Sequence, residues 1–269
     1  MPLVIFSILF GLAINHIGEE QKAVITNFFR AVSEAMLKIV DWVLFIAPIG
    51  IFCVVFPLAS KMGGSLAGAL GFYVLIWIIM SIVCIIILYI ITSVYTKIPI
   101  NKLMRGFAQP QFVALGTQSS VATLPAMVEA AEKKLGIQPR VVNIVLPLSV
   151  AVFKAGTTAV GVTYAFFSAH IMHIDLSVFQ LFMIFLISLA NGVGGAGLPS
   201  GASFFAPTIT LFMAAGLPVE MIPILFAVDT IPDMMVTVTN VSADMAAVTI
   251  VAKNGQNNVN SEASADEKF

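Results

Sequence analysis

The sequence predicts an all-α polytopic membrane protein, and three observations support this fold class. The chain is 59% hydrophobic and 10% charged, with a mean hydropathy of +1.02, whereas ordinary soluble domains carry about 25% charged residues. Residues 72–95 form an apolar run without a charge, which is long enough to cross a bilayer as a helix. Two further apolar segments are interrupted by small residues and proline near their centres, as in hairpins that enter a membrane without crossing it.

The N-terminal part of the sequence predicts one long helix, either straight or kinked. An amphipathic segment, residues 18–43, runs on into the apolar residues 44–59 across Pro48-Ile-Gly50. Residues 1–14 are apolar but too short to cross a bilayer, which takes about 20 residues. We therefore expect the chain to begin within a span or to lack upstream helices.

The two interrupted segments form a repeated unit. Each consists of a short apolar arm, a tip with Leu-Pro and a second short arm, and each is followed by a span with polar residues at its centre. The hairpins are residues 107–137 and 176–216, with tips at 119–125 and 192–199. Corresponding broken segments in two halves of a chain indicate a transporter site built from inverted repeats. A close crossing of two helices would explain one small-residue tip, but it does not explain two tips in register.

Charge placement predicts the orientation of these hairpins. Basic residues flank the first hairpin on both sides, whereas residues 170–216 contain no Lys or Arg. Cytoplasmic loops carry the excess of Lys and Arg, so the bases of the two hairpins should lie on opposite sides of the membrane. The last span then returns to the cytoplasm and leaves residues 254–269 as a polar, disordered cytoplasmic tail.

The last apolar segment, residues 221–252, carries a polar stripe. On a helix, side chains at intervals of three and four residues share one face. This spacing is found in Asp233, Thr237, Asn240 and Asp244, and Asp229 extends the stripe one turn upstream. A carboxylate at membrane depth costs about 2.5–3.5 kcal/mol on insertion scales, so each of these acids needs a partner or a ligand. For Asn240 and Asp244 an alternative is polar contact between helices, and Thr237 could bond its own helix backbone.

Together these segments resemble the dicarboxylate/amino acid:cation symporter family, which includes the glutamate transporters. Ser119-Ser-Val-Ala-Thr-Leu-Pro125 is similar to the serine-rich first tip of that family, and Gly192-Val-Gly-Gly-Ala-Gly-Leu-Pro199 is similar to its second tip. Residues 229–244, followed by Thr249-Ile-Val-Ala-Lys253, resemble its last helix. The resemblance covers nearly the whole chain, which corresponds to about the last two thirds of a typical member.

The resemblance implies an elevator-type transporter in the cell membrane. Residues 1–59 would be scaffold helices that hold a homotrimer, and residues 60–106 would be a transmembrane helix and a cytoplasmic loop. Residues 107–253 would form the mobile transport domain, with an extracellular gate at the second hairpin. Its parts would be hairpin 1 (107–137), a broken helix (141–173), hairpin 2 (176–216) and the last helix (219–252).

The resemblance also implies roles for individual residues in binding an amino acid. Asp233 matches the carboxylate that holds the substrate amino group, a pairing that suits a desolvated ammonium. Asp244 matches a cation ligand, with Asp229 as a carboxylate near it. The neutral groups around the amino acid would be Ser119, Ser120, Thr157, Thr237 and Asn240, with Gly195, Ala196, Gly197 and Leu198 from the second tip.

Two departures from the family pattern point to a neutral substrate. Members that carry acidic substrates have an Arg where this chain has Val236, and an Arg found in the first tip of some members is Gln118 here. No matched residue therefore neutralises a second carboxylate. We expect a preference for neutral amino acids, with Val236 facing the substrate side chain.

A third departure concerns sodium. The family motif Asn-Met-Asp-Gly-Thr corresponds to Phe153-Lys-Ala-Gly-Thr157, so Phe153 and Ala155 replace two ligands of a cation that needs oxygen. We expect sodium coupling to be lost and Lys154 to act as a built-in cation that could pair with Asp244. Lys154 could stay charged, giving a uniporter, or release a proton during the cycle, giving proton coupling. A lysine that snorkels to the membrane surface is the structural alternative.

Other functions remain open at this point. The family also admits a sodium- or proton-coupled symporter for glutamate, aspartate or dicarboxylates. An ion channel would use re-entrant tips as well, and an intramembrane hydrolase could activate Ser119 or Ser120 with Lys154. Net charge is −1, which gives no indication of nucleic-acid binding. The sequence shows no enzyme motif, metal site or cofactor site, and we place Cys53 and Cys84 in apolar packing.

Overall fold

The computed structural model describes residues 10–62, 64–194 and 200–266, and every element within these ranges is a helix. The predicted all-α fold class is confirmed. The chain divides into two compact units, Met1–Cys53 and Val54–Phe269. The polar residues singled out in the sequence all belong to the second unit.

The long N-terminal helix is present as α2 (Glu19–Met62), so the apolar and amphipathic segments predicted on either side of Pro48 form one helix. Glu19 and Glu20 occupy its first turn, where carboxylates interact favourably with the helix dipole. The boundary between the two units falls inside this helix.

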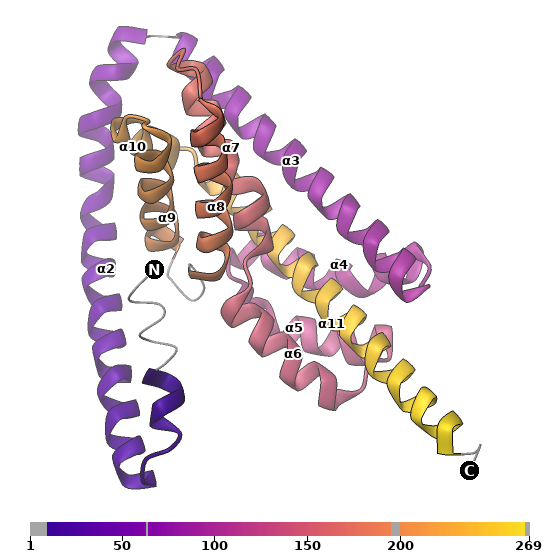
Figure 1. The fold of residues 1–269 in the computed structure, drawn as a ribbon. Helices are drawn as coiled ribbons and strands as arrows, with labels where there is room; N and C mark the ends of the chain where they lie inside the picture. Colours follow the sequence, from indigo (N-terminus) through magenta and orange to yellow (C-terminus); the bar gives the residue numbers. More distant parts are fainter. Residues whose placement is uncertain (1–9, 63, 195–199, 267–269) are drawn as a thin grey trace. The chain divides into compact units, whose positions relative to one another are not determined.

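Three helical stretches within the described residues are long and apolar enough to cross a membrane. The first, residues 68–96, lies in α3 (Gly64–Thr96). The second is the combined stretch 139–171, and the third covers residues 230–255. In Figure 1, α3 lies beside the last helix, and the two helices are in contact.

The first hairpin consists of α4 (Ile100–Thr117) and α5 (Ser120–Ala130), which pack against each other. Its first arm begins seven residues before the predicted start, directly after Pro99. Gln118 turns the chain with a left-handed backbone (φ 50°), and Ser119 caps α5. A π-helical turn, η1 (Ala131–Leu135), closes the second arm.

The predicted broken helix is present as α6 (Pro139–Val152) and α7 (Ala155–Ile171). The two residues between them, Phe153 and Lys154, have non-helical backbone angles. The Phe153 N–H still donates to the Ser149 carbonyl at 2.7 Å, so the helix ends at Phe153 and Lys154 becomes the N-cap residue of α7.

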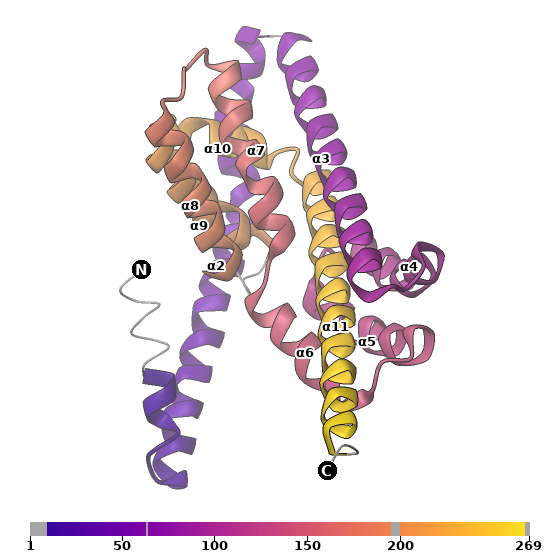
Figure 2. The same cartoon turned by 45° about the vertical axis from the view of Figure 1, so that its right-hand side comes forward.

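The second hairpin consists of α8 (Val178–Gly194) and α9 (Ser200–Ala215), which lie side by side in Figures 1 and 2. Side-chain amides fasten the two arms to each other. Gln180 Nε2 donates to the Ala215 carbonyl at 2.7 Å, and Asn191 Nδ2 donates to the Pro207 carbonyl at 3.1 Å. The Pro207 carbonyl also accepts from the Thr210 hydroxyl at 2.8 Å.

The last segment differs from the prediction of a single helix over 219–252. It begins with the 3₁₀ turn η2 (Val219–Met221) and α10 (Ile222–Phe226), followed by turn residues 227–229 and then α11 (Thr230–Asp266). Asp229 therefore lies just before the last helix rather than within it. The helix also continues beyond Ala252 through the residues predicted as a disordered tail, which contain no proline to end it.

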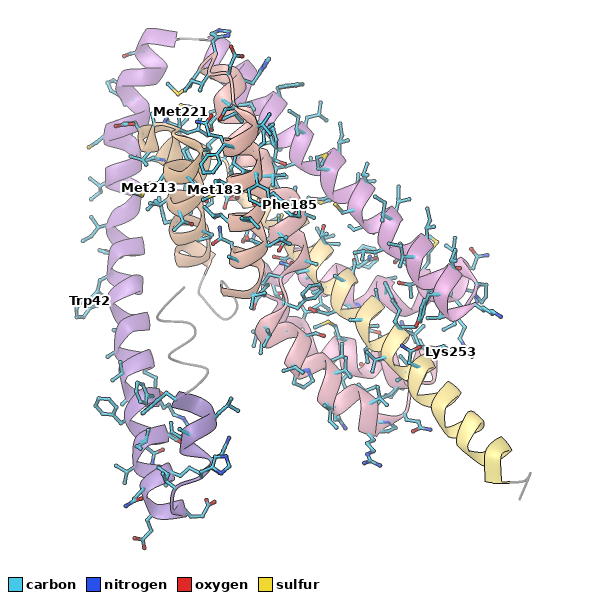
Figure 3. All side chains as sticks on the ribbon, viewed as in Figure 1. Trp42, Met183, Phe185, Met213, Met221 and Lys253 are labelled. Atoms are coloured by element: carbon cyan, nitrogen blue, oxygen red, sulfur yellow. The ribbon has the colours of Figure 1, made fainter. Side chains whose placement is uncertain are left out.

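Two apolar cores meet along α11. One involves hairpin 1, α6 and the middle of α11, including Phe107, Met127 and Val241. The other involves α3, α7, hairpin 2 and α10, including Trp77 and Phe212. Large apolar side chains also remain exposed, among them Phe185 on α8 and Met213 on α9 (Figure 3), as expected of a surface that faces lipid.

Candidate functional site

Polar groups from four elements converge on the break between α6 and α7. The Lys154 ammonium Nζ lies 3.1 Å from Ser120 Oγ at the tip of hairpin 1. The Lys154 backbone N–H donates to the Gly192 carbonyl of hairpin 2 at 2.8 Å. The Gly156 N–H donates to Asn240 Oδ1 of α11 at 2.8 Å. These contacts assemble residues that are far apart in the sequence into one polar region.

The two serines of the first tip have different local roles. Ser119 Oγ accepts the Ala122 N–H at 3.2 Å, so its hydroxyl caps α5 and satisfies one of the free donors at the helix start. Ser120 is 3% exposed, and its hydroxyl accepts from Lys154. The structure therefore ties Ser120, rather than Ser119, directly to the charged part of the site.

Asn240 caps the start of α7 from a distance. Its Oδ1 accepts from Gly156 N and from Thr157 N, at 2.8 and 3.4 Å, whereas the N-cap residue Lys154 makes no side-chain capping bond. A Cβ atom at Gly156 would lie 2.8 Å from the Val236 carbonyl oxygen. Glycine is thus required here by the close approach of α7 to α11.

A second close approach joins the broken helix to hairpin 2. A Cβ atom at Gly192 would overlap Thr158 Oγ1 and lie 3.3 Å from the Lys154 carbonyl oxygen. Thr158 Oγ1 itself donates to that carbonyl at 3.1 Å. Hairpin 2 therefore reaches the break through the end of its first arm. The predicted contacts from Gly195, Ala196, Gly197 and Leu198 fall outside the described residues.

The polar stripe on α11 contains both satisfied and unsatisfied groups. Thr237 donates its hydroxyl hydrogen to the Asp233 backbone carbonyl at 2.8 Å. The hydroxyl is therefore bonded within its own helix, which was one of the predicted alternatives. Asp233 is half-buried, and its carboxylate makes no hydrogen bond or ion pair with any described residue. Asp244 is 0% exposed, and neither carboxylate oxygen has a hydrogen-bond partner within the part of the chain that the structure describes.

Lys154 does not form the direct ion pair with Asp244 that the sequence suggested. In the described ranges, no carboxylate oxygen lies within ion-pair distance of its Nζ. The ammonium still interacts electrostatically with both Asp233 and Asp244. Its direct partner is the neutral hydroxyl of Ser120 because the lysine side chain extends toward hairpin 1.

Asp229 belongs to a different environment from Asp244. It is 7% exposed and accepts a hydrogen bond from the Tyr164 hydroxyl at 3.0 Å. The Tyr164 ring packs against Trp77, with ring centroids 4.6 Å apart. A helix rises about 1.5 Å per residue, so about 20 Å of α11 separates Asp229 from Asp244. Asp229 and Asp244 therefore have different neighbours, and a role for Asp229 near a cation stays a prediction.

Val236 is 8% exposed and packs within the second apolar core, rather than lining an open surface. Nor do three or more His, Cys, Asp or Glu side chains gather into a possible metal-binding group anywhere in the described ranges. The acidic residues of the site are spread along α11 and face different neighbours.

Sequence reasoning did not single out Gly156 as a packing position, or Tyr164 as the partner of Asp229. Gly156 was visible as a glycine beside a helix break, which is a common sign of close backbone approach. Tyr164 gave no comparable signal, because its partner lies 65 positions away on another element.

Comparison with known proteins matches the chain to the Sodium:dicarboxylate symporter family over residues 1–254. The chain is 31% identical to human Neutral amino acid transporter A over 91% of its length, and 32% identical to bovine Neutral amino acid transporter B(0) over 91%. It is 28% identical over 94% of its length to a Caenorhabditis elegans protein named "Putative sodium-dependent excitatory amino acid transporter glt-4". The chain spans about half the length of these relatives, 46%, 45% and 51% respectively.

Proposed function

Because this chain belongs to the sodium:dicarboxylate symporter family, whose members are membrane transporters rather than enzymes, we propose that it carries amino acids across a membrane and favours neutral ones. The observation that carries this proposal is the half-buried Asp233 carboxylate, which has no partner among the described residues and lies three positions before Val236. An ammonium group would neutralise this acid, whereas no basic residue near it on α11 would hold a second carboxylate.

The neighbouring neutral groups suit the rest of an amino acid. Asn240 uses Oδ1 to cap α7, which leaves its Nδ2 group to donate to a substrate carboxylate. Thr237 uses its hydroxyl hydrogen on the helix backbone, but its oxygen can still accept a bond from an ammonium. Thr157, Ser119 and Ser120 extend this polar wall toward hairpin 1. The contacts predicted for residues 195–198 stay a prediction.

We also propose that transport does not depend on sodium. Sodium needs oxygen ligands, and the side chains of Phe153 and Ala155 supply none. Asp244 does offer two oxygens that have no hydrogen-bond partner in the described part of the chain, but the Lys154 ammonium already acts on this carboxylate. A lysine that takes the charge of the bound cation would support either uniport or proton coupling.

The proposed movement is that of an elevator. Residues 107–253 would move as the transport domain, and residues 1–59 would form the scaffold of a homotrimer in the plasma membrane, with the C-terminus in the cytoplasm. The division of the chain at Cys53 and Val54 lies close to the proposed end of the scaffold and supports this assignment.

A second candidate is a sodium- or proton-coupled symporter for glutamate, aspartate or dicarboxylates. The fully buried Asp244, which has no hydrogen-bond partner among the described residues, favours it, because such a carboxylate is a suitable cation ligand. An ion channel has less support, since Ser120, Lys154 and Asn240 are held by direct contacts between packed helices. The Ser120–Lys154 pair is also what a hydrolase would need, but membership of a transporter family argues for a role in binding.

Uptake by the full chain reconstituted in liposomes tests the proposal. Radiolabelled alanine, leucine and aspartate would be supplied with sodium or with choline outside, at two pH values. We expect saturable uptake of the neutral amino acids that is unchanged when choline replaces sodium. Uptake of aspartate that rises steeply with sodium and is unaffected by neutral amino acids would instead establish the second candidate.

A further inference from the structure

Among the described residues, Lys154 has fewer partners than its ammonium can bind. Its side chain is half-buried, and its ammonium donates to Ser120 Oγ at 3.1 Å. A lysine ammonium carries three donors, and this bond uses one. The described residues place no carboxylate within ion-pair distance of it. A cation held by one neutral hydroxyl in an apolar domain is costly unless an anion joins it.

Packing fixes the position of this ammonium. The Lys154 backbone N–H is bound to Gly192 of hairpin 2, and its carbonyl accepts from Thr158 N at 3.0 Å and from Thr158 Oγ1 at 3.1 Å. The backbone at the helix break is therefore held on both sides. From this anchored position the side chain reaches the tip of hairpin 1 rather than the membrane surface, which disfavours the snorkelling alternative.

The surroundings of the Ser120 hydroxyl add to its preference for an anion. Ser120 is the first residue of α5, and a helix N-terminus carries a partial positive charge. The carboxylates that act on Lys154, Asp233 and Asp244, both lie on α11. Positive charge therefore faces the hairpin 1 side of the region, and negative charge faces the α11 side.

We propose that Lys154 binds the carboxylate group of the transported amino acid, together with Ser120, while Asp233 keeps the ammonium-binding role that the proposed function gives it. This inference rests on the proposed function and adds a determinant of specificity to it. The two charged ends of a zwitterion match the two charged sides of the region. Lys154 would then select for compounds that carry a carboxylate, in addition to supplying charge in place of a bound cation.

The two roles of Lys154 predict different effects on substrates without a carboxylate. A lysine that only replaces a cation should affect an amino acid and its amide alike, because both carry the ammonium group. A lysine that binds the carboxylate should affect the amino acid alone. Alanine with alaninamide, and leucine with leucinamide, are matched pairs for this comparison.

The experiment measures binding and uptake of these pairs by the full chain in liposomes, for the wild type, Lys154→Gln, Lys154→Arg and Ser120→Ala. We expect the wild type to prefer each amino acid to its amide. Lys154→Gln should weaken binding of the amino acid by about 10- to 100-fold, the usual effect of losing a charged hydrogen-bond partner, and change amide binding by less than about twofold. Lys154→Arg should keep most of the preference for the amino acid. Ser120→Ala should lose part of this preference, but less of it than Lys154→Gln.

Lys133→Gln is a matched control, since Lys133 is an exposed lysine paired with Glu129 at 3.1 Å, and it should leave the preference unchanged. Equal losses for amino acid and amide in Lys154→Gln, or a wild type that binds both alike, would overturn the inference while leaving amino acid transport intact. If Lys154→Gln does not fold, Ser120→Ala and Lys154→Arg test the inference instead. The quantity compared is again the ratio of amino acid binding to amide binding. A wild type that binds and transports no amino acid would overturn the proposed function itself.

Discussion

The second unit contains two helix breaks that carry opposite charges. Lys154 stands immediately before α7, and Asp229 stands immediately before α11. A helix N-terminus attracts negative charge and repels positive charge. Asp229 is therefore placed where the helix favours it, and Lys154 is placed where the helix opposes it.

The hydrogen bonds at the two breaks follow the same division. Asp229 accepts from Tyr164, and its backbone carbonyl accepts the Asp233 N–H at 2.8 Å, so both its side chain and its backbone support the local fold. Lys154 leaves the start of α7 to be capped by Asn240. The first arrangement serves structure, whereas the second, in our proposal, keeps an ammonium available for a ligand. The predictions below test this difference, in order of decreasing effect on stability.

The largest loss of stability is expected at the helix break that contains Asp229. Tyr164→Phe removes the donor to a buried carboxylate, and the loss of a hydrogen bond to a charged group costs about 1.5–3 kcal/mol. The free energy of unfolding, measured by denaturation in detergent micelles, should fall by this amount. Tyr89→Phe is the control, because the Tyr89 hydroxyl donates to the neutral Gln111 Oε1 at 3.3 Å. An equal loss in both variants would show that the charge at Asp229 adds nothing.

At the Lys154 break, packing rather than charge should dominate stability. Gly156→Ala places a methyl group 2.8 Å from the Val236 carbonyl oxygen, and overpacking of this kind costs about 1–3 kcal/mol. Gly161→Ala on the same helix is the control, since a Cβ atom there meets nothing within 4 Å. Alanine favours a helix over glycine by up to about 1 kcal/mol, so this variant should melt at a higher temperature. A Gly156→Ala variant as stable as the wild type would contradict the close approach of α7 to α11.

Removal of the Asn240 cap of α7 should reduce stability by an intermediate amount. Asn240→Ala leaves the Gly156 and Thr157 N–H groups without their acceptor, and removal of a helix cap costs about 0.5–2 kcal/mol. Asn240→Asp keeps an acceptor at the same place and should retain most of the thermal stability. Hydrogen exchange of the Gly156 amide gives a local measurement, with faster exchange expected in Asn240→Ala only.

The smallest expected change in stability is an increase rather than a decrease. Lys154→Gln removes a positive charge from a helix N-terminus, which should raise the free energy of unfolding by about 0.3–1 kcal/mol. Asp229→Asn removes a favourable charge and should lower it. Melting temperatures that shift in the same direction in both variants would argue against the division between a structural break and a ligand-binding break.

Much of this architecture could be predicted from local sequence. Small residues and proline marked both hairpins, an apolar run marked α3, and Lys154-Ala-Gly156 marked the break between α6 and α7. The spacing of Asp233, Asn240 and Asp244 identified one face of α11. These signals are local, because they depend on helix periodicity and on residues that favour or interrupt helices.

The missed features depend on contacts between distant parts of the chain. Lys154 was expected beside Asp244, but its direct contact is Ser120, 34 positions away. The break before α11 was not predicted, because the apolar background of residues 221–252 favours one continuous helix. The bond that holds Asp229 comes from Tyr164 on another helix. Periodicity places a residue on a helix face, but it does not show which neighbouring helix occupies that face.

The cap of α7 also has a consequence for biogenesis. Asn240 lies 84 positions after Gly156, so α7 is synthesised and meets the membrane before its cap exists. Until α11 is inserted, the first N–H groups of α7 must be satisfied by water or by the insertion machinery, because hydrocarbon cannot satisfy them. Completion of the broken helix is thus coupled to arrival of the last helix. A nascent chain that stops before Thr230 should be retained by cellular quality control even though hairpin 1 and α6 have already been made.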